Sequence, residues 1–284
     1  MFKKRESIDR SKITGDFVTL SAGVVNYKVE GDLQGNGEWV VLVHGLIGPS
    51  FVWEKIVPWL LARNHRVLSY DLFGRGFSDR PNEAYSQEFF VNQLEDLLEV
   101  LDITDPVNLV GWSMGGNICR NFVERNPDKV LKLILIAPAF KFAASALVGY
   151  VFRSTFFGVA MNLAGELIMK KAVKTQHFFG QGDIVDYVNK ATMQMQYDGF
   201  MRATISILRN MFPEKGSYQT LKVLSLPVLL LWGDQDKVTP IKNTSKVREV
   251  FLNCEVEIII NSKHAPHYEH PEQVGLLISN FLRS

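Results

Sequence analysis

Residues 111–115, which read Gly-Trp-Ser-Met-Gly, constrain the fold more than any other segment of the chain. They follow an apolar run typical of a buried strand, residues 106–110, and precede a helix-compatible stretch, residues 116–126. A serine at a tight strand-to-helix turn points its hydroxyl out of the sheet, and flanking glycines leave room for the sharp backbone. The free N–H groups of the next helix face the same space. The pattern therefore predicts that Ser113 is a nucleophile beside a site that stabilises negative charge.

An acid and a base follow in the second half of the chain. Residues 227–232 predict another buried strand, and Asp236 comes shortly after its end. Residues 254–260 predict a last strand, which is followed by His264. Because the carboxyl ends of parallel strands meet at the sheet edge where ligands bind, we expect the serine, the carboxylate and the imidazole to converge there.

Continuous apolar runs and helical periodicity outline the remaining elements. An opening pair of strands is predicted before a series in which buried strands alternate with helices, and this alternation indicates a doubly wound sheet covered on both faces. The predicted strands are residues 17–20, 24–29, 39–43, 66–70 and 130–136, and the predicted helices are residues 51–63 (with a kink at Pro58), 86–101 and 271–283.

Four segments, in this order, resemble the motifs of α/β-hydrolase-fold enzymes, in particular the capped members that are esterases or lipases. The resemblance extends from about residue 17 to the C-terminus and implies a mostly parallel sheet with an inserted helical cap. The chain departs from the family at Lys263, since a glycine commonly precedes the histidine. The segments are residues 43–46 (VHGL), residues 71–78 (DLFGRGFS), the turn at residues 111–115, and the pair formed by residues 233–240 and 264–271.

The resemblance implies a role for each matching residue. Ser113 would attack the substrate, and His264 would take its proton, since an imidazole is largely neutral at pH 7. Asp236 would hold the imidazole in the required tautomer. The backbone N–H groups of Leu46 and Met114 would bind the oxyanion, so these two side chains need not be polar.

Two alternatives remain at this point. Asp234 is a second candidate for the acid, but the family spacing Gly-x-x-Asp-x-x-x-Pro favours Asp236. The spacing of His264, His267 and His270 would also suit a metal ion. No second cluster supplies further ligands, so we expect neither a metal nor a cofactor.

The alternation of strands and helices stops between residues 139 and 218, where helical periodicity continues without strands. We therefore expect a core formed by residues 1–138 and 219–284, and a cap formed by residues 139–218. The cap holds six of the eight methionines and nine of the 19 phenylalanines of the chain. Most of these should form the cap's own core, and the others should give an apolar roof suited to an acyl chain. The residues expected to contact the substrate are Trp112, Phe140, Phe142, Met193 and Phe200.

A serine at the strand-to-helix turn disfavours the reactions of relatives that use a carboxylate there, which open epoxides or displace halide. We expect hydrolysis of a carboxylic ester with an apolar acyl chain, through an acyl-enzyme intermediate. One alternative is a C–C bond hydrolase of ring-fission products, although such relatives often carry asparagine in place of Trp112. Two others are a cofactor-free perhydrolase and a non-enzymatic small-molecule receptor that keeps the hydrolase pocket.

Charge and cysteine content indicate the partners and the compartment. The chain has 31 Lys and Arg against 30 Asp and Glu, a net charge of +1, which gives no electrostatic case for nucleic acid. The expected partner is a small-molecule ester. Cys119 and Cys254 are expected to be buried free thiols in a reducing compartment.

We expect a cytoplasmic protein, because the N-terminal region shows no secretory signal pattern. The longest apolar region, residues 142–169, is interrupted by Arg153 and Glu166, so we expect no membrane-spanning helix. A peripheral contact between the cap and a membrane or lipid is compatible with the three lysines that follow this region, Lys170, Lys171 and Lys174.

Overall fold

The computed structural model describes residues 6–140, 151–152, 154–176, 184–211, 221, 225–251 and 253–283, and the structural statements below refer to these residues. They contain an eight-stranded sheet in the order β1-β2-β4-β3-β5-β6-β7-β8. The first two pairings are antiparallel and the other five are parallel, which confirms the mostly parallel sheet. The strands are β1 (Asp16–Leu20), β2 (Gly23–Glu30), β3 (Trp39–Val43), β4 (Arg66–Tyr70), β5 (Val107–Trp112), β6 (Val130–Ile136), β7 (Val228–Gly233) and β8 (Cys254–Ile259).

The central strands β3, β5 and β7 are buried along their whole length. Successive side chains of β3 alternate between the two faces of the sheet. Val41 and Val43 belong to the hydrophobic core on one face, whereas Val40 and Leu42 belong to the core on the other. Because both faces are covered, these strands are continuously apolar in sequence.

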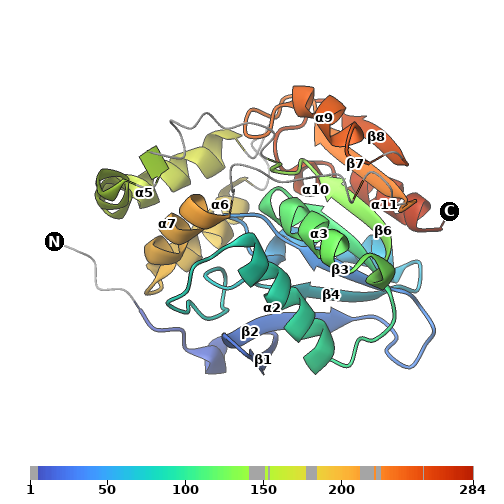
Figure 1. Ribbon diagram of the computed structural model, residues 1–284, viewed down its shortest axis with the longest axis horizontal. Coiled ribbons are helices and arrows are strands. Elements are labelled where there is room, and N and C mark those ends of the chain that lie inside the picture. Colours follow the sequence, from blue (N-terminus) through green and yellow to red (C-terminus); the bar gives the residue numbers. More distant parts are fainter. Residues whose placement is uncertain are drawn as a thin grey trace.

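Helices cover both faces of the sheet (Figure 1). Phe90 of α2 and Phe122 of α3 pack in the same core as Val41, and Leu60 of α1 and Ile278 of α11 pack in the core on the other face. This arrangement confirms the doubly wound fold. The α-helices are α1 (Val57–Leu61), α2 (Gln87–Val100), α3 (Met114–Arg125), α5 (Thr155–Gln176), α6 (Ile184–Met193), α7 (Phe200–Asn210), α9 (Thr244–Arg248), α10 (Pro266–Glu269) and α11 (Pro271–Arg283), and the 3-10 turns are η1 (Arg10–Lys12), η2 (Ser50–Trp53), η3 (Pro127–Lys129), η4 (Gln194–Gln196) and η5 (Ile241–Asn243).

The single helix predicted over residues 51–63 is wrong. The segment forms the 3-10 turn η2 and then the short helix α1, which begins at Val57. Pro58 lies in the first turn of α1, where a backbone N–H would have no helical partner. The proline therefore helps to begin a helix here and does not bend a longer one.

Between β6 and β7 the described residues form three longer helices, α5, α6 and α7, which gather on one side of the molecule (Figure 1). α5 packs against both of the others. The helical character predicted for this segment is therefore present in its described part. The boundaries of the cap at residues 139 and 218 stay a prediction, because residues 141–150 and 212–220 lie outside the described ranges.

Candidate active site

Ser113 lies at the sharp turn between β5 and α3. Its φ of 53° falls in a region that residues other than glycine rarely adopt, and its N–H donates to the carbonyl of Ile136 at 2.9 Å. A Cβ at Gly115 would overlap the carbonyl oxygen of Val43, so the start of α3 can approach β3 only with glycine at that position. The local sequence thus produces the predicted turn, with Ser113 7% exposed.

A chain of two hydrogen bonds joins the three side chains that the sequence singled out. Nε2 of His264 lies 2.9 Å from Oγ of Ser113, and Nδ1 of His264 lies 2.8 Å from Oδ2 of Asp236. The three side chains come from the ends of β5, β7 and β8 and are all buried. A serine, an imidazole and a carboxylate therefore form one buried chain of hydrogen bonds.

The carboxylate of Asp236 is held as an acceptor by its own loop. Oδ1 accepts the backbone N–H groups of Val238 at 2.8 Å and Thr239 at 2.9 Å, and Oδ2 accepts the Thr239 hydroxyl at 2.8 Å. Burial acts to raise the pKa of Asp236, but the hydrogen bonds from His264 and Thr239 outweigh it and hold this pKa below its usual value. Asp236 is therefore charged at neutral pH.

The alternative acid, Asp234, has a different task. Its Oδ1 accepts the N–H of Ser262 at 3.1 Å, which ties the loop after β7 to the loop after β8. The two loops touch because Gly233 has no side chain, since a Cβ there would overlap the carbonyl oxygen of Lys263. Glu269 then accepts the N–H of Lys263 at 2.8 Å. These contacts hold the segment that carries His264.

Thr239 is a site residue that the sequence analysis missed. Besides its bonds to Asp236, its backbone carbonyl accepts the indole N–H of Trp232 at 2.6 Å, and its hydroxyl lies 3.1 Å from the carbonyl of Ala137. The sequence does contain a signal for this role, because Thr239 follows Asp236 by three positions. Asp and Thr side chains at such a spacing commonly form hydrogen bonds within a turn.

The loop after β3 lies directly against Ser113. A Cβ built on Gly45 would lie 3.2 Å from Cβ of Ser113, and Leu46 is the next residue. On the other side, Met114 is the first residue of α3 and is buried. The N–H groups in the first turn of a helix have no partner within the helix. Leu46 and Met114 thus lie on two segments next to the serine, and their role as oxyanion donors stays a prediction.

His44 fixes the shape of this loop. Its Nδ1 lies 2.7 Å from the carbonyl of Gly45, and its Nε2 accepts the N–H of Leu72 at 2.9 Å. Since Nε2 accepts, the ring proton belongs on Nδ1. Burial lowers the pKa of His44 to about 4, against the smaller opposing effect of Asp71. A neutral imidazole therefore links the loops after β3 and β4.

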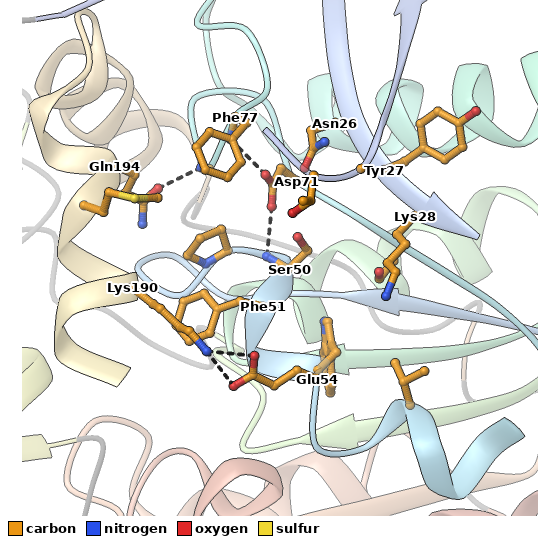
Figure 2. Close-up of a pocket in the computed structure, with 18 of the residues that line it drawn as sticks. Asn26, Tyr27, Lys28, Ser50, Phe51, Glu54, Asp71, Phe77, Lys190 and Gln194 are labelled. Atoms are coloured by element: carbon orange, nitrogen blue, oxygen red, sulfur yellow. Dashed lines mark hydrogen bonds and ion pairs between the residues drawn. The ribbon is translucent and has the colours of Figure 1, made fainter. Parts of the chain in front are cut away.

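Gln194, in the cap, is a second residue that the sequence analysis did not identify. It is fully buried, its Oε1 accepts the N–H of Gly76 at 2.9 Å, and its Nε2 donates to the carbonyl of Ile47. Asp71 also binds the same two core loops, because its carboxylate accepts the N–H groups of Ser50 at 2.9 Å and Phe77 at 2.8 Å (Figure 2). One cap side chain is thus bonded to the loop that contains Leu46.

A groove of about 360 Å³ opens between the cap and the part of the sheet that contains β2 and β4 (Figure 2). Met193 and Lys190 line it from α6, and Lys190 forms an ion pair across it with Glu54, at 2.9 Å. Among the described residues that line this groove, neither Ser113 nor His264 is present. Met193 therefore lines this groove, and the ion pair between Lys190 and Glu54 joins α6 to the core beside it.

Two of the predicted substrate contacts are wrong. Trp112 and Phe200 have no exposed surface. Trp112 donates its indole N–H to the carbonyl of His264, and Phe200 packs beneath the guanidinium of Arg75. Both side chains pack in the interior near the site, and neither has surface that a ligand could contact.

Of the five predicted contacts, Met193 lines the groove described above, and the remaining two have different outcomes. Phe140 is 7% exposed and packs near Phe251, with 6.5 Å between ring centroids, so it belongs mainly to the core. Phe142 lies outside the described residues. The direction of a side chain at these positions depends on tertiary packing, which hydrophobicity alone does not give.

The side chains of the three histidines near the C-terminus lie in different surroundings. His264 faces Ser113, while the ring of His267 lies 4.8 Å from Trp53 and 5.0 Å from Trp112. His270 lies 3.2 Å from the carbonyl of Asn261. Within the described part of the chain, no group of three or more His, Cys, Asp or Glu side chains is arranged to hold a metal ion.

The cysteines differ in burial. Cys119 is a buried free thiol, as predicted, and burial raises its pKa. Cys254 is also free but only partly buried, and burial raises its pKa to about 11. Neither thiol is activated as a nucleophile.

Across the described segments, we find no helix with the length and apolar character needed to cross a membrane.

The chain is similar to known proteins in both sequence and fold. Residues 38–271 match the family described as alpha/beta hydrolase fold. The "Putative non-heme chloroperoxidase" of Synechocystis sp. is 28% identical over 256 residues, covering 88% of this chain and 92% of that protein. "Monoacylglycerol lipase ABHD6" of Homo sapiens is 24% identical over 261 residues, covering 86% and 75%. The enol-lactonase of Burkholderia xenovorans LB400 superposes with a TM-score of 0.81 at 19% identity, covering 95% of this chain and all of that one. The three names refer to different reactions.

Proposed function

Because the chain belongs to the alpha/beta hydrolase fold family, we propose that it is a serine hydrolase that cleaves carboxylic esters through an acyl-enzyme. The observation that carries this proposal is the buried hydrogen-bond chain from Asp236 through His264 to Ser113. It supplies a nucleophile, a base in contact with it, and a carboxylate that orients the base.

In the first half of the reaction, Oγ of Ser113 attacks the ester carbonyl carbon while its proton passes to Nε2 of His264. The imidazolium is stabilised by Asp236, which stays ionised. The tetrahedral intermediate collapses, its bond to the alcohol oxygen breaks, and His264 returns the proton to the departing alcohol. The acyl group remains on Ser113 as an ester.

In the second half, His264 takes a proton from a water molecule, whose oxygen attacks the acyl carbon. The new tetrahedral intermediate collapses, the carboxylic acid leaves, and Ser113 recovers its proton from His264. Each oxyanion would accept hydrogen bonds from the N–H groups of Met114 and Leu46. One such donor contributes a factor of roughly 10² to 10³ in kcat.

We propose an apolar acyl group for the substrate. The support comes from the hydrophobic core that runs from the sheet into the cap, where Met161 and Met201 join Val110 of β5. Tyr187 of α6 also lies over Gly48, in the loop that contains Leu46. Most of the cap's methionines are packed inside: Met161, Met169, Met195, Met201 and Met211 are buried, and Met193 is exposed.

The proposal is tested by turnover of p-nitrophenyl esters of increasing acyl length. The unaltered protein should hydrolyse them, and Ser113→Ala should lower kcat by roughly 10⁴ to 10⁶ without loss of structure. Asp236→Asn should cost about 10⁴ in kcat, whereas Asp234→Asn is the matched control and should cost far less. A sharp preference for acetate would contradict the apolar acyl group.

Folded protein that turns over no ester would contradict the esterase proposal. That result would favour C–C bond cleavage, perhydrolysis or a non-catalytic receptor, which share the same arrangement of side chains.

A further inference from the structure

α5 is apolar on two opposite sides. Met161, Gly165, Met169 and Val173, spaced four residues apart, are buried, and the three larger side chains among them belong to the core shared with α6 and α7. A helix at the surface of a globular protein normally turns polar residues outward on the opposite side. α5 does not follow that rule.

The outer side of α5 exposes large apolar side chains. Phe156 is 82% exposed, Leu163 is 69% and Leu167 is 73%, and Val159 and Ile168 are each more than half exposed. Residues 156, 159, 163 and 167 recur at intervals of three and four, so they form one stripe along the helix. Scattered exposed apolar residues are ordinary, but a contiguous stripe marks a contact surface.

The same side becomes basic at the C-terminal end of the helix. Lys174 follows Phe156 by eighteen positions, about five helical turns, so it lies in line with the stripe. Lys171 is also exposed, and Lys170 forms an ion pair with Glu166 at 2.7 Å. Lysines near a helix C-terminus also suit the helix dipole, but that effect gives no reason for the exposed apolar side chains.

We propose that the outer side of α5 docks the protein on the surface of an anionic lipid bilayer. The stripe of Phe156, Leu163 and Leu167 enters the boundary between headgroups and acyl chains, and Lys171 and Lys174 contact the lipid phosphates. An apolar helix face that ends in lysines matches such a surface in both hydrophobicity and charge. The helix lies on the bilayer and does not cross it, since among the described residues no helix has the length and apolar character to do so.

Docking of this kind brings the cap to a source of apolar esters. Lys263, the residue before His264, donates its ammonium to the carbonyl of Thr175 near the end of α5, at 3.0 Å. The proposed membrane-contacting helix is thus bonded to the segment that carries the proposed base.

The test is cosedimentation with vesicles, using the Ser113→Ala protein so that no lipid is turned over. One set of vesicles contains phosphatidylcholine alone, and the other an equal mixture with phosphatidylglycerol. The protein should bind the mixed vesicles and bind phosphatidylcholine much more weakly. Adding Leu163→Ser and Leu167→Ser together should weaken binding roughly tenfold or more, and Lys171→Gln with Lys174→Gln should weaken it by about fivefold per charge.

Asn162→Ser, on an exposed part of α5 outside the stripe, is the matched control and should bind as before. The same α5 substitutions, made with Ser113 intact, should leave turnover of a soluble ester unchanged, which separates lost docking from lost folding. Because binding is measured without turnover, failure of the proposed chemistry would not affect it. Absence of binding to mixed vesicles, or binding unchanged by the two serine substitutions, would overturn the proposal. So would a dimer that these substitutions dissociate, since the stripe would then be a contact between two copies of the chain.

Discussion

The indole N–H of Trp112 donates a hydrogen bond to the backbone carbonyl of His264, with 2.7 Å between nitrogen and oxygen. The residue that precedes the proposed nucleophile thus holds the backbone of the proposed base. The two rings also lie near each other, with 5.5 Å between their centroids. Trp112 is therefore a positioning residue for His264.

Replacing Trp112 with phenylalanine should lower kcat more than it changes KM. The substitution removes the indole donor to a buried carbonyl, and losing such a hydrogen bond costs about 1–3 kcal/mol of stability. We expect kcat to fall roughly tenfold because the imidazole is less firmly oriented. Steady-state kinetics and urea unfolding check this. Trp53→Phe is the control, because within the described residues the Trp53 indole N–H has no hydrogen-bond partner. Equal kcat losses in the two variants would contradict the assigned role.

Replacing Gln194 with methionine should impair catalysis from the cap. The change keeps the size of the side chain but leaves the N–H of Gly76 and the carbonyl of Ile47 without their partner. We expect a stability loss of about 2–4 kcal/mol and a lower kcat, since Ile47 follows Leu46 directly. Thermal unfolding and ester turnover measure both. Gln196→Met, in the same turn, is the control. A variant with normal kcat would show that the cap does not position this loop.

The folded protein should lose stability as pH falls from about 6.5 to about 4. His44 has a pKa of about 4 when folded against an ordinary value of 6.5, so the unfolded chain takes up the proton first. The stability contribution is full above pH 6.5 and is lost through this window, by about 3 kcal/mol. His65, whose pKa is also lowered by burial, acts in the same window, whereas Asp236, whose lowered pKa starts from the ordinary value of 3.8, adds to the loss below that pH.

Nitrogen NMR of the histidine rings isolates the contribution of His44. Its ring should stay neutral at about pH 5, with the proton on Nδ1. A resonance that titrates near pH 6.5, or a proton on Nε2, would contradict the hydrogen-bond assignment.

Replacing Lys263 with methionine should loosen the end of α5. The substitution removes the donor to the carbonyl of Thr175 while keeping most of the aliphatic chain. Loss of one such exposed bond, worth about 1 kcal/mol, should speed amide exchange in the last turn of α5 by roughly fivefold. Hydrogen exchange read by mass spectrometry measures it, with the exposed Lys242→Met as the control. Unchanged exchange would mean that Lys263 does not hold the cap.

The sequence predicted those features that depend on short-range patterns. β3 and β7 could be identified because strands covered on both faces are continuously apolar. The turn at Ser113 could be identified because the glycine at position 115 lets the start of α3 approach β3 closely. The convergence of Asp236 and His264 followed from the rule that parallel strands end at a common edge.

The remaining features depend on contacts between distant segments. Gln194 bonds to backbone groups 118 and 147 residues away, and a backbone partner leaves no trace in sequence. Trp112 and Phe200 were expected at the substrate because large apolar residues suit a pocket, but tertiary packing turned both inward. Pro58 was assigned to the middle of a helix because periodicity does not mark where a helix begins.

We propose that His264 and Asp236 make Ser113 nucleophilic. The most direct measurement is labelling with a fluorophosphonate, followed by peptide mapping. We predict a single adduct, on the peptide that contains Ser113, which is absent in Ser113→Ala and forms far more slowly in His264→Ala. An adduct on a different residue, or no adduct on protein that hydrolyses esters, would contradict the account.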